Sequence, residues 1–344
     1  SERQAPSQAD AATDSVETPS FDHDSASADT EREPTSPEAT PGHWVRHEAG
    51  WRYELVDGTW MKDGVFDVEG RRYAFDARGY VPVGWYKDPS GAWYASTENG
   101  VRTGWYREGG SWYHLGEGGA MTTGWLSSGG SWYYLAATGQ MVTGWSRVDG
   151  SWYHFDASGA MAASTWVRSG SWYYLGGSGA MASGWFIADG TWYYAGPDGA
   201  MRTGWVQTDG SWYYLYSSGA LASGWLQDGS SWYYLDPDTG VMATGWLKDG
   251  DTWYYLNASG AMANGWVNLG GAWFYLNGNG SMAIGWAAVG GQWYYLTESG
   301  QMAIGWVKDG GSWYFCHPSG AMATGRVVID GTAYTFDGAG RWVA

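Results

Sequence analysis

The sequence predicts an all-β fold, an elongated solenoid of stacked β-hairpins of about 20 residues each. Three observations lead to this prediction. Tryptophans that mostly follow glycine recur every 20 residues, give or take one, along most of the chain. A second tryptophan stands seven residues after most of them, beyond a glycine-containing turn. A methionine then recurs at a constant phase before the next unit. A fixed period of this size is typical of architectures in which each repeat stacks on its neighbours.

The unit over residues 123–135 shows why a hairpin is expected. Two short aromatic runs flank the turn sequence Ser-Ser-Gly-Gly, which is a hairpin signal. With the turn centred between the second serine and the first glycine, Trp125 would face Trp132 directly across the strands. Alternation along a strand would then put Trp132 and Tyr134 on one face and Tyr133 on the other.

The recurring methionines predict contacts between units. A single hairpin with apolar side chains on both faces is not stable in water, so successive hairpins must bury those faces by stacking. Methionine adapts well to aromatic neighbours, so packing between repeats and a share in a pocket wall are both open. The methionine column is Met121, Met141, Met161, Met181, Met201, Leu221, Met242, Met262, Met282, Met302 and Met322.

Composition predicts four segments. Residues 1–41 form an acidic, Ser/Thr/Pro-rich segment that we expect to be a disordered linker, because it has too little apolar surface to offset chain entropy. Residues 42–83 look like degenerate repeats that cap the N-terminal end, and residues 84–325 form the repeat array. Residues 326–344 are expected to be a degenerate C-terminal cap, since the terminal units of solenoids are commonly atypical.

Two edits interrupt the period inside the array. Trp166 stands only six residues before Trp172, which predicts a different loop and a displacement of Trp166 from the pattern. One extra residue lies in the turn around residues 236–240, where loops tolerate insertions easily.

Charge and cysteine usage narrow the classes of function. The net charge of −17 argues against nucleic acid, which requires a basic surface, and is compatible with a cationic ligand or with solubility alone. The single cysteine, Cys316, excludes an internal disulfide framework. It stands where other repeats have leucine, so a small buried apolar side chain is expected. The sequence contains no run of 18 apolar residues, so we expect no transmembrane helix.

No pattern of catalytic residues stands out. The sequence has no Ser-His-Asp arrangement, metal-spaced histidine cluster or phosphate-binding loop, so we expect no catalytic residue, no metal and no cofactor. The chain begins without an initiator methionine or a signal peptide. We therefore expect either a signal that has been removed or a piece of a longer protein, whose catalytic part would lie outside this sequence.

The paired tryptophans are the feature that carries chemistry. Two indoles on one face, joined by an aromatic ring of the next hairpin, would form a three-walled box. Such walls attract a quaternary ammonium through the ring quadrupole, by about 0.5–2 kcal/mol per contact. Packing alone is the simpler explanation for one repeat, but packing would accept Leu, Ile or Val at many positions. Tryptophan is nearly constant at two places in twelve units.

The pattern Gly-Trp, then Trp-Tyr-Tyr-Leu, then Gly-x-Met-x-Thr-Gly-Trp resembles the choline-binding, or cell-wall-binding, repeat family of Gram-positive surface proteins. The resemblance is strong over residues 84–325 and weak over residues 42–83. It implies a left-handed superhelix of hairpins, with cages that hold the choline of teichoic acids between two tryptophans of one repeat and a tyrosine of the next. The predicted cages are Trp105, Trp112 and Tyr134; Trp145, Trp152 and Tyr174; Trp185, Trp192 and Tyr214; Trp205, Trp212 and Tyr234; Trp225, Trp232 and Tyr255; Trp246, Trp253 and Tyr275; and Trp266, Trp273 and Tyr295.

Four further cages depart from this pattern at the position expected to close them. Histidine stands there at His114 and His154, where a protonated imidazole would repel a cation, and Phe315 offers a ring without a hydroxyl. Thr335 would leave the last box open. The cages in doubt are those led by Trp85, Trp125, Trp286 and Trp306.

These observations predict a noncatalytic, multivalent cell-wall-binding module. Its partner would be choline-bearing teichoic acid or another wall polysaccharide, with no nucleic acid and no membrane span. Its location would be secreted and at the cell surface, associated with the wall. Three alternatives stay open: recognition of α-glucan or another carbohydrate, a structural spacer or adhesin stalk, and a wall hydrolase with its catalytic part elsewhere.

Overall fold

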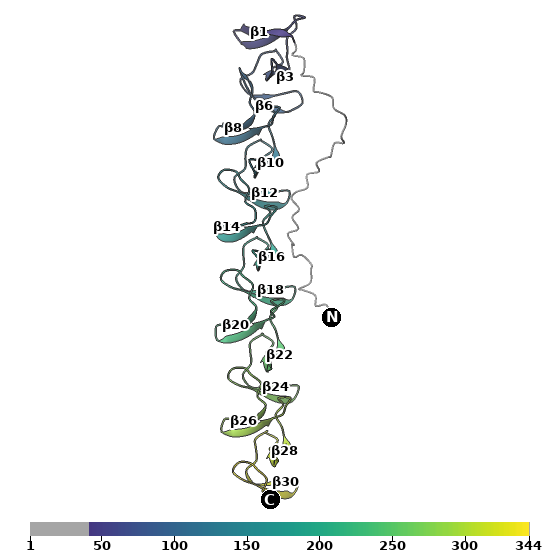
Figure 1. Ribbon diagram of the computed structural model, residues 1–344, viewed down its shortest axis with the longest axis vertical. Helices are drawn as coiled ribbons and strands as arrows, with labels where there is room; N and C mark the ends of the chain where they lie inside the picture. The colour runs from purple at the N-terminus through teal and green to yellow at the C-terminus, as the bar shows by residue number, and fades with distance from the viewer. Residues whose placement is uncertain (1–40, 344) are drawn as a thin grey trace. The chain divides into compact units, whose positions relative to one another are not determined.

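The computed structural model describes residues 41–343, and these residues form antiparallel β-hairpins joined by turns, without a helix (Figure 1). The predicted all-β hairpin repeat is confirmed. The predicted linker at residues 1–41 lies outside the described residues except for its last position, as does Ala344. Within residues 41–343 there is therefore no helix that could span a membrane.

The described chain divides into two compact units. One holds residues 41–188 and 195–201, and the other holds residues 189–194 and 202–343. Within each unit, hairpins follow one another in chain order (Figure 1).

The first unit contains these strands: β1 (Gly42–His47), β2 (Gly50–Leu55), β3 (Gly64–Val68), β4 (Arg71–Phe75), β5 (Gly84–Lys87), β6 (Trp93–Thr97), β7 (Gly100–Val101), β8 (Gly104–Glu108), β9 (Ser111–Leu115), β10 (Gly124–Ser128), β11 (Ser131–Leu135), β12 (Gly144–Val148), β13 (Ser151–Phe155), β14 (Thr165–Ser169), β15 (Ser171–Leu175) and β16 (Gly184–Ala188). Strand β17 (Thr191–Ala195) follows. The second unit continues with β18 (Gly204–Thr208), β19 (Ser211–Leu215), β20 (Gly224–Asp228), β21 (Ser231–Leu235), β22 (Gly245–Asp249), β23 (Thr252–Leu256), β24 (Gly265–Leu269), β25 (Ala272–Leu276), β26 (Gly285–Val289), β27 (Gln292–Leu296), β28 (Gly305–Asp309), β29 (Ser312–Cys316), β30 (Gly325–Ile329) and β31 (Thr332–Phe336).

The register of the hairpin β10–β11 is representative. Trp125 pairs with Tyr134, and Trp132 pairs with Ser127. The turn is the two-residue Gly129–Gly130, and both residues have positive φ, as the tightest hairpin turns require. The expectation that Trp125 directly faces Trp132 is wrong, because the turn lies one residue later than expected. The two indoles are diagonal neighbours on the same face, with centroids 6.4 Å apart.

Backbone hydrogen bonds join each hairpin to the one before it. The residue in the methionine column donates its N–H to the carbonyl of the second tryptophan of the preceding hairpin, as Met141 does to Trp112 at 2.8 Å. The same methionine forms a bridge with the last residue of its own hairpin, as Met141 does with Leu135. These contacts fix the spacing between successive hairpins within a unit.

The core is a row of single side chains rather than one globular centre. The last residue of the second strand is fully buried in hairpin after hairpin, including Leu135, Leu215, Leu235 and Leu276. Cys316 takes this place in β29 and is also fully buried, which confirms the expectation from its position. A repeat with so small a core depends on its neighbours for stability.

The shortened unit at Trp166 keeps its pairing. Trp166 pairs with Tyr174 just as Trp125 pairs with Tyr134. The missing residue comes out of the turn, where only Gly170 lies between Ser169 and Ser171. The expected displacement of Trp166 is therefore wrong, because cross-strand pairing is retained and the turn absorbs the deletion.

Candidate functional site

The candidate site is the seam between two successive hairpins, named here by its first tryptophan. At the Trp205 seam, the rings of Trp205 and Trp212 meet edge to face with centroids 6.5 Å apart. Tyr233 of the next hairpin lies 4.8 Å from Trp205. Together with Met242, these three rings line an open recess of about 290 Å³. Ala258 and Ser259 complete its rim. They lie in the turn that follows β23, two hairpins after the one that holds Trp205.

The same arrangement recurs at a second well-formed recess. Trp266, Trp273, Tyr294 and Met302 line a space of about 250 Å³ with Ser319 at the rim. Trp266 lies 6.4 Å from Trp273 and 4.8 Å from Tyr294. The near-perpendicular indoles keep the recess open, and 42% of the Trp273 surface remains exposed. A guest can therefore reach the ring faces from solvent.

The ring that closes each seam comes from the next hairpin. It belongs to the residue directly after that hairpin's second tryptophan, and not to the residue one position later that the sequence led us to expect. The ring that lies 4.8–5.1 Å from the leading tryptophan across the seam is Tyr133 for Trp105, Tyr173 for Trp145, Tyr233 for Trp205, Tyr254 for Trp225, Phe274 for Trp246 and Tyr294 for Trp266.

The tyrosines predicted to close these cages lie elsewhere. Each packs against the first tryptophan of its own hairpin at 5.0–5.2 Å: Tyr134, Tyr174, Tyr214, Tyr234, Tyr255, Tyr275 and Tyr295. The reason is the register. The second tyrosine pairs directly with its own hairpin's tryptophan and shares its face, while the preceding residue points to the opposite face, toward the earlier hairpin.

The structure brings the two rings of four predicted tryptophan pairs into edge-to-face contact. Trp105 and Trp112, Trp205 and Trp212, Trp246 and Trp253, and Trp266 and Trp273 have ring centroids 6.3–6.5 Å apart. Trp145 with Trp152 and Trp225 with Trp232 occupy the same places in their hairpins. Trp185 and Trp192 belong to different units, so the cage predicted for them stays a prediction.

The four cages in doubt each have an aromatic closing ring, because the histidines, Phe315 and Thr335 are not at the closing position. Tyr113 lies 5.0 Å from Trp85, and Tyr153 lies 4.8 Å from Trp125. The remaining two seams are closed by Tyr314, 4.8 Å from Trp286, and Tyr334, 5.0 Å from Trp306. In the last seam Trp342 replaces the methionine and lies 6.0 Å from Trp306.

His114 occupies the second-tyrosine position and faces its own Trp105 at 5.2 Å. Its Nδ1 lies 3.0 Å from the Thr122 hydroxyl. Burial lowers the pKa of His114 below its usual value of 6.5, so the ring is neutral near pH 7. The repulsion of a cation that its sequence position suggested is absent at that pH.

The methionines have both of the roles left open by the sequence. Met242 and Met302 line the two recesses. Methionine thioethers also pack against a glycine of the next turn, as Met121 does; a Cβ built on Gly139 would lie 2.2 Å from Sδ of Met121. The column is thus a floor of the seams and a contact between repeats.

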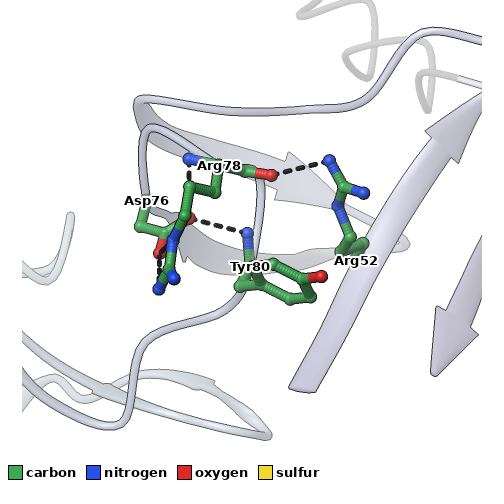
Figure 2. Close-up of polar contacts among 4 residues, drawn as sticks. All are labelled: Arg52, Asp76, Arg78 and Tyr80. Atoms are coloured by element: carbon green, nitrogen blue, oxygen red, sulfur yellow. Dashed lines mark hydrogen bonds and ion pairs between the residues drawn. The ribbon is translucent and has the colours of Figure 1, made fainter. Parts of the chain in front are cut away.

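The first hairpins show an aromatic pair that already holds a cation. Arg52 follows Trp51, at the position that a closing tyrosine takes in later repeats. Its guanidinium lies 4.1 Å from the ring centre of Trp60 and 4.9 Å from that of Tyr80. It donates a hydrogen bond of 2.6 Å to the carbonyl of Arg78, in the turn that Asp76 organises (Figure 2). This chain therefore places its own cation between two rings of the repeat.

Comparison with known proteins agrees with this geometry. A family model described as the choline-binding repeat matches residues 102–143, 142–186, 182–224, 202–244, 222–264 and 263–305. A model described as a putative cell wall binding repeat matches residues 304–322. No curated protein sequence matches the chain.

Solved structures of choline-binding proteins share the fold. CbpJ from Streptococcus pneumoniae is 32% identical with a TM-score of 0.54, and the alignment covers 70% of this chain and 99% of CbpJ. Choline-binding protein F from Streptococcus pneumoniae is 29% identical with a TM-score of 0.51, over 70% of this chain and 98% of that protein. With most of its length matched by the repeat models and its seams built from the repeated aromatic residues, the chain belongs to the choline-binding repeat family.

Proposed function

We propose that this chain is a noncatalytic, multivalent module that holds the choline of teichoic acid, or of a similar wall polymer, in the seams between hairpins. In this way it would anchor a secreted protein to the cell surface. The observation that carries the proposal is the open recess of Trp205, Trp212, Tyr233 and Met242. Three ring faces and a thioether suit a trimethylammonium group, which needs aromatic contact and has no N–H to donate.

The family supports the ligand, and the repetition supports the mode of binding. Each cation–π contact contributes about 0.5–2 kcal/mol, so one seam alone would bind choline weakly. Linked sites that engage one polymer gain avidity of roughly 10²–10⁴ over a single site when their spacing allows simultaneous contact. A wall polymer that bears many choline groups is the kind of partner that such an array fits.

The test is retention of the protein on a choline or tertiary-amine matrix. We expect retention, and elution by free choline. The matched control is 3,3-dimethylbutan-1-ol, which has the shape of choline with carbon in place of the charged nitrogen and should not elute the protein. Elution by both compounds would show that shape rather than charge is recognised.

The alternatives give different results in the same assay. Retention on dextran that choline does not disturb would favour carbohydrate recognition by the exposed indoles. Retention on neither matrix would favour a structural stalk. Release of fragments from purified wall by this chain alone would contradict the noncatalytic assignment.

A further inference from the structure

The seams differ in charge although their rings are arranged alike. The Trp105 and Trp205 seams form a matched pair. In both, the two indoles lie 6.5 Å apart and the closing tyrosine lies 4.8 Å away at an interplanar angle of 64°. Any difference in ligand affinity between them must therefore come from the residues around the rings.

The indole N–H of the leading tryptophan points at the last residue of the next hairpin's first strand. At the Trp205 seam that residue is Asp228, whose carboxylate accepts the hydrogen bond at 2.9 Å. At the Trp105 seam it is Ser128, whose neutral hydroxyl accepts at 3.2 Å. Carboxylates take this place at two more seams of the second unit, Asp249 beside Trp225 at 2.9 Å and Asp309 beside Trp286 at 3.1 Å. Glu108 does so beside Trp85.

The Trp105 seam also differs from the Trp205 seam by a basic side chain. The residue directly across the strands from the second tryptophan shares its face. At the Trp105 seam it is Arg107, whose guanidinium lies 5.9 Å from the Trp112 ring. At the Trp205 seam it is the neutral Gln207. The neutral residues Gln227 and Ala288 stand there at the two other carboxylate seams of the second unit.

No basic side chain pairs with these carboxylates. Within residues 41–343, no ion pair joins Lys, Arg or His to Asp228, Asp249 or Asp309. Each lies beside an indole whose face lines the seam. A nearby anion attracts a cation directly, and an indole N–H that donates to an anion carries more electron density on its ring face, which strengthens cation–π attraction.

We propose that Asp228, Asp249 and Asp309 are specificity-determining residues that make the Trp205, Trp225 and Trp286 seams the first to take up a quaternary ammonium ion. The Trp105 seam, with Arg107 and without a carboxylate, fills last among seams of equal ring geometry. This inference rests on the proposed function and adds an order of occupancy to it.

Methionine ε-methyl groups report on the seams one at a time. Met242 lines the Trp205 recess, and Met141 bonds to Trp112 of the Trp105 seam just as Met242 bonds to Trp212. The experiment is a choline titration of the full chain labelled with ¹³C-methyl methionine, followed by NMR, with signals assigned by Met→Leu substitutions. We expect the Met242 signal to reach half-saturation at a choline concentration about three- to tenfold lower than the Met141 signal, and the difference to shrink as salt is added.

Reciprocal exchange of one residue tests the cause. Asp228→Ser should move the half-saturation of Met242 toward that of Met141, and Ser128→Asp should move Met141 in the other direction. The signal of Met302, in a seam untouched by either change, should titrate as before and shows that the fold is retained. The chemically similar 3,3-dimethylbutan-1-ol should show no ordering.

Failure of this inference is distinct from failure of the proposed function. Equal half-saturation of Met141 and Met242, or no response to the exchange, would overturn the ordering while leaving choline binding intact. If choline moved none of the methionine signals, the proposed function would fail and the ordering with it.

Discussion

At the scale of single residues, each seam depends on which of two adjacent aromatic residues turns toward the preceding hairpin. Tyr233 closes the Trp205 seam, whereas Tyr234 packs on Trp225 of its own hairpin. Tyr233→Ala removes one of three aromatic walls, and we expect about tenfold weaker choline binding at the Met242 signal, from the loss of roughly 1–2 kcal/mol of cation–π attraction.

Tyr234→Ala is the matched control for that change. It deletes the same side chain one position later, so it should leave the affinity reported by Met242 largely unchanged and act instead on the Trp225 seam, reported by Met262. If the two substitutions exchanged these effects, the wall assignment would be wrong.

Cys316 gives a second prediction at this scale. Its side chain is fully buried, and burial raises the pKa of the thiol to about 11. The reactive thiolate is therefore scarce below that pH and also shielded. We expect no reaction with Ellman's reagent at pH 8 in the native protein and one thiol per chain after unfolding in urea. Rapid native reaction would show that this end of the array opens readily.

At the residue scale, the sequence could not predict how successive hairpins face each other. The recurrence of tryptophan, glycine and methionine predicted hairpins, their stacking and the paired indoles. The choice between Tyr233 and Tyr234 depended on which face of a hairpin meets the preceding hairpin. Strand alternation places the two side chains on opposite faces, but it does not say which face turns toward the earlier hairpin. Asp228 received no role because its partner, Trp205, lies 23 residues earlier, and spacing alone gives no signal for that hydrogen bond.

At the scale of one element, two glycines with the same backbone conformation have different roles. Gly130, in the hairpin turn, and Gly139, in the turn before the next hairpin, both have φ of +80°. An added Cβ meets nothing within 4 Å at Gly130, whereas at Gly139 it lies 2.2 Å from Sδ of Met121. The first glycine serves only the turn, and the second also lets two repeats approach each other.

This difference predicts that alanine substitution at the two glycines lowers the free energy of unfolding by different amounts. Gly130→Ala should lower the free energy of unfolding by about 1 kcal/mol, because alanine is strained in the left-handed backbone conformation. Gly139→Ala adds steric overlap and should cost about 2–4 kcal/mol in total. Urea denaturation followed by tryptophan fluorescence measures both. Met121→Ala should reduce the extra cost of Gly139→Ala when the two are combined; strictly additive effects would contradict the packing explanation.

At the scale of the whole molecule, stability and ligand binding are coupled through the number of occupied seams. A seam exists only while two successive hairpins are folded against each other, so choline binds the native state and not the unfolded chain. Each occupied seam stabilises the fold by RT ln(1 + [L]/Kd), which is about 1.4 kcal/mol at ten times Kd. Because the seams repeat along the chain, these contributions add within each unit.

We therefore expect the thermal unfolding temperature to rise steadily with choline, and the total stabilisation to exceed what a single site gives at the same concentration. Calorimetry in choline and in equal concentrations of 3,3-dimethylbutan-1-ol measures the effect, and only choline should produce it. Trp205→Ala should remove the increment of one seam and leave most of the rise. Complete loss of the rise on this one change would mean that the seams are not independent sites, and that occupancy of one seam is required before its neighbours can bind.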